Sequence, residues 1–209
     1  MDQSISRVKD YVSSFKEVRD LQFETVPYDL DSHEGISYLL LVASINQSTS
    51  AEHVRDLMRA LYDSLGDDLL RLHDIQLENY QSVLDQFKGS NCKIWSSVPK
   101  ILSSASKLIE KTKEHGGFVE RGKAQKSTLQ AANRLANNIY YMGKRPGGAR
   151  KKVWMFLRWM VRPSPDVGIW STLDASELRV PLDTNTGRAF QDLTKDTSFH
   201  ERVCSVIEN

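Results

Sequence analysis

Cysteine is scarce in this sequence, and the two residues present, Cys92 and Cys204, lie far apart. Because they form no Cys-x-x-Cys pair, we predict neither a disulfide framework nor a cysteine-bound zinc or iron–sulfur cluster. The five histidines show no metal-ligand spacing either. We therefore expect no metal and no other cofactor.

Long apolar runs are also missing. The longest, from Tyr38 to Ala43, is far shorter than the ~20 residues that a helix needs to span a bilayer, and no charged-then-apolar leader opens the chain. Apolar residues at 40% and charged residues at 26% are typical of a globular protein. We expect an intracellular monomer, in the cytoplasm or nucleoid and away from membranes, with residues 1–209 forming a single unit.

No convincing pair of strands joined by a turn is visible. Instead, apolar residues recur at helical spacing over residues 5–15, 54–65, 80–87, 101–109 and 128–142. The second of these segments follows a capping box, Thr49-Ser50-Ala51-Glu52, and we expect it to end at Gly66. The sequence therefore predicts an all-α fold of nine or ten helices, some of them short.

Acidic residues are absent from residues 144–162, although the net charge of the whole chain is only +1. The basic residues of this stretch are Lys144, Arg145, Arg150, Lys151, Lys152, Arg158 and Arg162. A local basic face can hold an anion even when the total charge is near zero. Because Arg150, Arg158 and Arg162 fall outside the apolar stripe of the helix predicted here, we expect them to be free to meet solvent or phosphate.

A glycine-rich turn precedes this basic helix. Glycine lets backbone N–H groups approach a phosphate closely, and the N-terminus of the following helix adds positive potential. We therefore expect Gly147, Gly148, Arg150 and Lys152 to bind the DNA backbone.

Two motifs in this region resemble a known superfamily. Residues 146–151, Pro-Gly-Gly-Ala-Arg-Lys, resemble the Pro-Gly-x-Gly-x-Lys hairpin of endonuclease III and its relatives, the helix-hairpin-helix DNA glycosylases. Residues 182–186, Leu-Asp-Thr-Asn-Thr, resemble the Asp-Thr-His segment of that superfamily. The separation of 32 positions between Lys151 and Asp183 is similar to that of archaeal 8-oxoguanine DNA glycosylases. The block from Phe156 to Arg162, with residues 166–170 and 181–183 after it, is similar to a family of mostly uncharacterised proteins related to those enzymes.

The resemblance implies a helix-hairpin-helix glycosylase fold, in which two helical lobes face each other across the active site. The hairpin and catalytic helix would span about residues 133–162, and the catalytic aspartate segment about residues 180–190. Lys151 would be the nucleophile that attacks the sugar, with Lys152 as the nearest alternative. Asp183 matches the essential aspartate, and a carboxylate there is suited to stabilising a cationic sugar transition state.

Two further residues are candidates for binding the substrate. Residues 41–50 look like the Leu-x-x-Gln-x-Thr segment of the superfamily, which implies that Gln47 contacts the opened DNA or the flipped base; a polar cap near Thr49 is the alternative. Phe156 could stack on a base, but its place on the apolar face equally fits the core. The same choice between stacking and core applies to Trp95, Trp154, Trp159 and Trp170.

Together these features predict a base-excision repair DNA glycosylase with abasic-site lyase (β-elimination) activity. Its partner would be double-stranded DNA containing a damaged base, with 8-oxoguanine expected from the resemblance alone. One alternative is a non-catalytic helix-hairpin-helix DNA-binding module, which would not need Asp183. Another is a helical protein whose basic face binds an acidic partner.

Overall fold

The helical spacing of the sequence carries through to the structure, a computed structural model that describes residues 21–47, 49–88, 95–143 and 150–179. Over these ranges the chain forms seven α-helices, four short 3-10 helices and no strand, so the all-α prediction is confirmed there. None of these helices has the length and apolar character needed to cross a membrane. The α-helices are α2 (His33–Ile45), α3 (Ala51–Leu65), α4 (Glu78–Gln86), α5 (Val98–Lys113), α6 (Gly117–Lys123), α7 (Thr128–Asn138) and α8 (Lys151–Val161).

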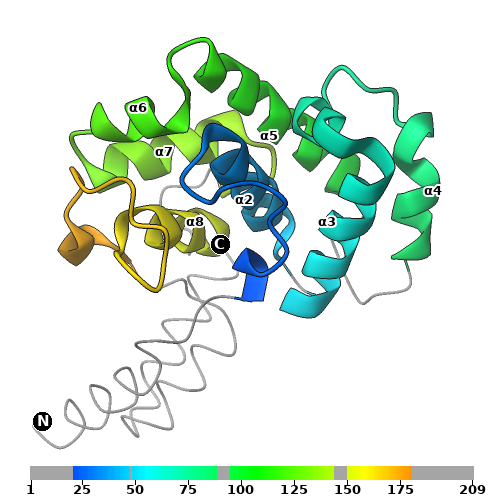
Figure 1. Cartoon of the computed structure of the whole chain (residues 1–209), viewed down its shortest axis with the longest axis horizontal. Coiled ribbons are helices and arrows are strands. Elements are labelled where there is room, and N and C mark those ends of the chain that lie inside the picture. The colour runs from blue at the N-terminus through cyan, green and yellow to red at the C-terminus, as the bar shows by residue number, and fades with distance from the viewer. Residues whose placement is uncertain (1–20, 48, 89–94, 144–149, 180–209) are drawn as a thin grey trace, which may run out of the picture.

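Helix α2 forms the centre of the arrangement. Figure 1 shows α3 and α4 on one side of it and α6, α7 and α8 on the other, and α2 packs against α3, α5, α6 and α8. Every residue from Gly35 to Ile45 is buried, as expected for a helix without a polar face. Gly35 is required near its start, because a Cβ there would lie 2.1 Å from the carbonyl oxygen of Asp29.

Helix α3 shows how local signals set helix ends. Its N-cap is Ser50, whose hydroxyl accepts a hydrogen bond from the backbone N–H of His53 at 3.2 Å. The capping-box motif would have given this role to Thr49, one residue earlier; a hydroxyl at either position can cap a helix. The helix ends at Gly66, as the sequence predicts, and the φ of this glycine is 55°.

The other predicted segments have mixed outcomes. Residues 80–87 and 101–109 lie in or beside α4 and α5, as expected, whereas residues 5–15 are outside the described ranges. Helix α7 ends at Asn138 and not near residue 142, because Ile139 takes an extended backbone (φ −108°, ψ 127°). This change of direction buries Ile139 and Met142 while leaving Tyr141 on the surface.

The chain folds back on α8 after that helix ends. The backbone N–H groups of Val167 and Gly168 donate to the carbonyl of Trp159, and the N–H of Trp170 donates to that of Met160 at 2.8 Å. The indole of Trp170 then packs directly against Gly122, where a Cβ would lie 1.9 Å from its Cδ1. The remaining described elements are the 3-10 helices η1 (Leu21–Phe23), η2 (Gly66–Arg71), η3 (Trp95–Ser97) and η4 (Ala175–Glu177).

Candidate functional site

The C-terminal end of α2 and the N-terminal end of α8 meet at a contact that we call the α2–α8 junction. Two hydrogen bonds define it. Lys152 Nζ donates to the carbonyl oxygen of Ser44 at 3.0 Å, and Asn46 Nδ2 donates to Met155 Sδ at 3.6 Å. The junction thus joins two segments more than 100 residues apart in the sequence, and both segments carry predicted site residues.

Lys152 lies inside the protein at this junction. Only 4% of its surface is exposed, and its ammonium lies 5.4 Å from the centre of the Tyr141 ring. The carbonyl of Ser44 belongs to the last turn of α2, where the helix dipole is negative and favours a cation. Because the side chain is buried, we do not keep Lys152 among the residues proposed to contact DNA.

Lys151 is the first residue of α8 and is partly exposed. Met155 lies one turn further along, so Lys151 and Met155 share a face of α8. That face meets the end of α2, since Met155 accepts the bond from Asn46. Gln47 follows directly and is partly buried, with its backbone N–H donating to Ile45 O at 2.8 Å. The structure therefore brings the segments of Lys151 and Gln47 to one junction, while their chemical roles stay predictions.

Several predicted site residues lie outside the described ranges. These are Asp183, in the segment after residue 179, and Gly147 and Gly148, in the predicted hairpin. The pairing of Lys151 with Asp183 and the phosphate contacts of the hairpin therefore also stay predictions.

The residues that flank the predicted hairpin, Gly143 and Arg150, lie against each other. A Cβ on Gly143 would stand 3.0 Å from Cγ of Arg150. Arg150 caps α8 with a left-handed backbone (φ 48°, ψ 38°), which is uncommon for a residue other than glycine. Its Nη1 donates to Asn133 Oδ1 at 2.6 Å, which ties the start of α8 to α7. Arg150 is thereby held half-buried at the start of α8, next to the predicted hairpin, whereas the sequence led us to expect it free to meet solvent or phosphate.

The C-terminal end of α8 corrects another expectation. Arg158 and Arg162 were expected to be free, but both face the buried carboxylate of Asp166, with Nε atoms 3.6 Å and 2.8 Å from Asp166 Oδ2. The Asp166 side chain is only 2% exposed. The expectation was wrong because the neutralising acid lies just beyond the acid-free stretch, four residues after Arg162.

The aromatic candidates belong mainly to the core. Phe156 is fully buried, with ring centroids 6.4 Å from Phe118 and 5.9 Å from Trp170 in edge-to-face geometry. Trp154, Trp159 and Trp170 are buried as well. A base cannot stack on Phe156 without displacing these neighbours, so we leave it out of the proposed base site and assign it to the core.

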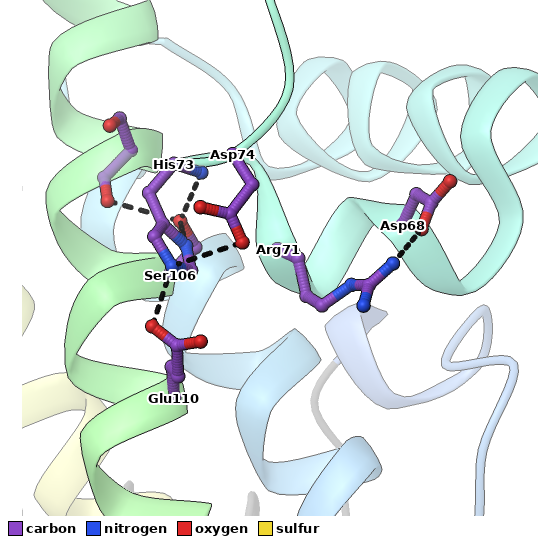
Figure 2. A network of polar contacts seen from close by, with 7 residues as sticks. Asp68, Arg71, His73, Asp74, Ser106 and Glu110 are labelled. Carbon is purple, nitrogen blue, oxygen red and sulfur yellow. Dashed lines mark hydrogen bonds and ion pairs between the residues drawn. The ribbon is translucent and has the colours of Figure 1, made fainter.

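A second polar cluster lies at the end of η2, on the face of α5, and Figure 2 shows it closely. His73 Nε2 lies 2.7 Å from Glu110 Oε2 and 3.5 Å from Asp74 Oδ2. The Ser106 hydroxyl accepts the backbone N–H of His73 at 2.8 Å and lies 3.1 Å from its Nδ1. Sequence spacing did not reveal this group, since Glu110 lies 37 positions after His73 in the sequence.

His73, Asp74 and Glu110 are a conceivable metal-ligating set, because their ligand atoms lie within 4.8 Å of one another. His73 already bonds Ser106 and Glu110 of α5, however. The pKa of Arg71 is raised, first by its hydrogen bond and charge interaction with Asp68 and then by the charges of Asp74 and Glu110. We therefore interpret the cluster as a structural link between η2 and α5.

Comparison with known proteins adds one result to this geometry. A family described as "Protein of unknown function (DUF2400)" matches residues 39–200, which include both sides of the α2–α8 junction and the segment of Asp183. No curated protein and no solved structure matches the chain. Since the match covers most of the chain, the protein belongs to the DUF2400 family of proteins of unknown function.

Proposed function

We propose that this protein is a base-excision repair DNA glycosylase with abasic-site lyase activity, in which Lys151 is the nucleophile. The observation that carries the proposal is the α2–α8 junction, where the helix that begins with Lys151 docks on the end of the helix that precedes Gln47. An amine that attacks a sugar and an amide that contacts the opened DNA have to lie close together. The resemblance in both segments supports the same pairing.

The helix-hairpin-helix glycosylase fold is part of this proposal. It requires two groups of helices that face each other across the DNA. The separation of α3 and α4 from α6, α7 and α8 by the central α2 supports such an arrangement (Figure 1). The hairpin between α7 and α8, with Gly147 and Gly148, would bind the DNA backbone, and Arg150 at its foot would add a positive charge.

The reaction begins when the damaged base leaves the helix, since its sugar is inaccessible inside duplex DNA. The neutral amine of Lys151 then attacks C1′ of the deoxyribose: the N–C1′ bond forms, the glycosidic bond breaks, and the base leaves with the bonding electron pair. The nitrogen gives one proton to the departing base. The C1′–O4′ bond then breaks as the N=C1′ bond of the Schiff base forms, and the second proton of the nitrogen goes to O4′. Loss of a proton from C2′ then expels the 3′ phosphate by β-elimination.

The attack uses the amine of Lys151 in its neutral form. Asp183 is assigned an electrostatic task. Its carboxylate would stabilise the positive charge that develops on the sugar and orient the amine.

Borohydride trapping tests the proposal directly. The full chain is incubated with duplexes that contain an abasic site, 8-oxoguanine or other damaged bases, and a covalent complex is sought after reduction. We expect trapping with the abasic and 8-oxoguanine duplexes; the latter follows from the resemblance to archaeal 8-oxoguanine DNA glycosylases. Lys151→Gln should abolish trapping while DNA binding persists.

Lys152→Met is the matched variant, because it removes the neighbouring amine and keeps a buried, unbranched side chain. Trapping should survive in this variant. If only Lys152→Met loses trapping, the nucleophile is Lys152. If the wild-type protein traps no substrate and releases no base, the enzyme proposal fails, and DNA binding without trapping would identify a non-catalytic module.

A further inference from the structure

Tyr141 combines exposure with an unusual backbone. Its side chain belongs to the few large apolar groups exposed in the described ranges, with 49% of the residue accessible. Its φ is 62°, in the left-handed region that bulky residues rarely adopt. Such a conformation persists only when the surrounding structure holds it, and it is frequent at binding sites.

The position of Tyr141 connects it to the α2–α8 junction. The Lys152 ammonium that donates to Ser44 O also lies 5.4 Å from the centre of the Tyr141 ring. This distance is within the range of a cation–π interaction. In sequence, Tyr141 stands two residues before Gly143, which adjoins Arg150. An aromatic ring is therefore held at the foot of the predicted hairpin, beside the helix that starts with Lys151.

We propose that the ring of Tyr141 is a stacking platform for an unpaired nucleobase of the bound DNA. The inference rests on the proposed function, which makes DNA the ligand of this junction. Flipping one nucleotide leaves neighbouring or opposite bases without a stacking partner. A ring that is already fixed by Lys152 loses little freedom when a base stacks on it, and every base has a π-face that can do so.

The proposal distinguishes Tyr141 from the other aromatic candidates. Phe156, Trp159 and Trp170 are buried and cannot receive a base. Leu129 is almost as exposed, at 47%, but it lies near the start of α7 and has no aromatic face. Leu129 therefore provides the control for loss of an exposed apolar side chain.

The test uses the full chain and a duplex in which a tetrahydrofuran abasic-site analogue faces 2-aminopurine. The analogue cannot form a Schiff base, so binding is measured apart from chemistry. Affinity is followed by fluorescence anisotropy of a labelled strand, and stacking by quenching of 2-aminopurine. The variant Tyr141→Phe keeps the ring. The variant Tyr141→Asn removes the ring, and asparagine tolerates the left-handed backbone. If thermal melting shows that the Tyr141→Asn protein is unfolded, Tyr141→Gly takes its place.

We expect wild type, Tyr141→Phe and Leu129→Gln to bind alike and to quench 2-aminopurine. Tyr141→Asn should bind about tenfold more weakly, the usual loss when one stacking ring is removed, and should leave the fluorophore bright. Equal affinity and equal quenching in a folded Tyr141→Asn or Tyr141→Gly protein would overturn the stacking role, as would a wild-type protein that does not bind this duplex. If Lys151 is trapped on DNA but substitution of Tyr141 changes neither affinity nor quenching, the enzyme proposal holds and the stacking role fails. If quenching depends on Tyr141 but no covalent complex is trapped, the stacking role holds and the enzyme proposal fails.

Discussion

Both ends of α8 carry basic residues, but the hydrogen-bond partners of these residues differ between the two ends. At the N-terminal end, Arg150 donates to the side-chain amide oxygen of Asn133, and Lys152 donates to the backbone carbonyl of Ser44. At the C-terminal end, Arg158 and Arg162 both face the buried carboxylate of Asp166. The first two hydrogen bonds use uncharged oxygens, and the second pair of contacts uses an anion.

This difference decides what each end can do. A hydrogen bond to a neutral oxygen leaves a positive charge in place, whereas the one carboxylate of Asp166 offsets one of the two arginine charges, most directly that of Arg162 at 2.8 Å. Binding to DNA depends on cations that can neutralise phosphates. At the C-terminal end, Asp166 ties Arg158 and Arg162 to the segment that folds back on α8. At the N-terminal end, Arg150 keeps its positive charge in the contact with Asn133, and the proposed function assigns that charge to the DNA backbone.

The largest effect on stability is expected at the anchored, C-terminal end. Gly122→Ala would place a Cβ 1.9 Å from Cδ1 of Trp170, the residue that folds back on α8. The indole must move and its hydrogen bond to Phe118 O, now 3.0 Å, must shift. We expect the free energy of unfolding in urea to fall by about 3 kcal/mol. Lys123→Ala, at the exposed neighbouring position, should change it by less than about 0.5 kcal/mol; equal stability of the two variants would contradict this packing.

Asp166→Asn should have the next largest effect, because it removes the buried carboxylate that both arginines share. Breaking a fully buried ion pair costs about 3–5 kcal/mol. Here the Arg158 and Arg162 side chains are 31% and 41% exposed, so water replaces part of the lost interaction. We expect a loss of about 2 kcal/mol in chemical denaturation. Arg162→Gln should then cost much less in the Asp166→Asn background than in the wild type, and additive losses would show that the pair is not coupled.

Lys152→Met tests the stability of the N-terminal end. The variant loses the bond to Ser44 O, but it also removes a charge from the interior, and these two contributions oppose each other. We expect a net loss of about 1 kcal/mol in the same denaturation measurement, smaller than for Asp166→Asn. A larger loss for Lys152→Met would reverse the comparison and make the N-terminal end the main structural anchor.

The smallest expected effect concerns the salt dependence of DNA binding, and it rests on the proposed function. Each neutralised phosphate adds about 0.9 to the magnitude of the slope of log Kobs against log salt. Arg150→Gln should reduce this slope by about that amount, because its charge is not cancelled by a carboxylate in the contact with Asn133. Arg162→Gln should leave it unchanged. Equal reductions in both variants would show that Asp166 does not neutralise the C-terminal end.

Sequence alone determined the elements whose signals are local. The periodic apolar residues of α3, α4 and α5 predict helices, and Gly66 correctly marks the end of α3, since caps and helix faces depend on residues within one or two turns. The basic stretch at α8 was visible for the same reason. The resemblance in three segments added Lys151, Asp183 and Gln47 as candidates, and of these residues Lys151 and Gln47 lie in the described part of the chain.

Tertiary structure alone decided which of these side chains are buried and which reach the surface. Lys151 and Lys152 are neighbours in sequence, but the rotation of about 100° per helical residue sends one toward the surface and buries the other beneath Tyr141. Likewise, the burial of Asp166 against two arginines depends on the chain folding back after α8. Sequence spacing predicts which face of a helix a residue occupies; what covers that face is set by packing between distant segments.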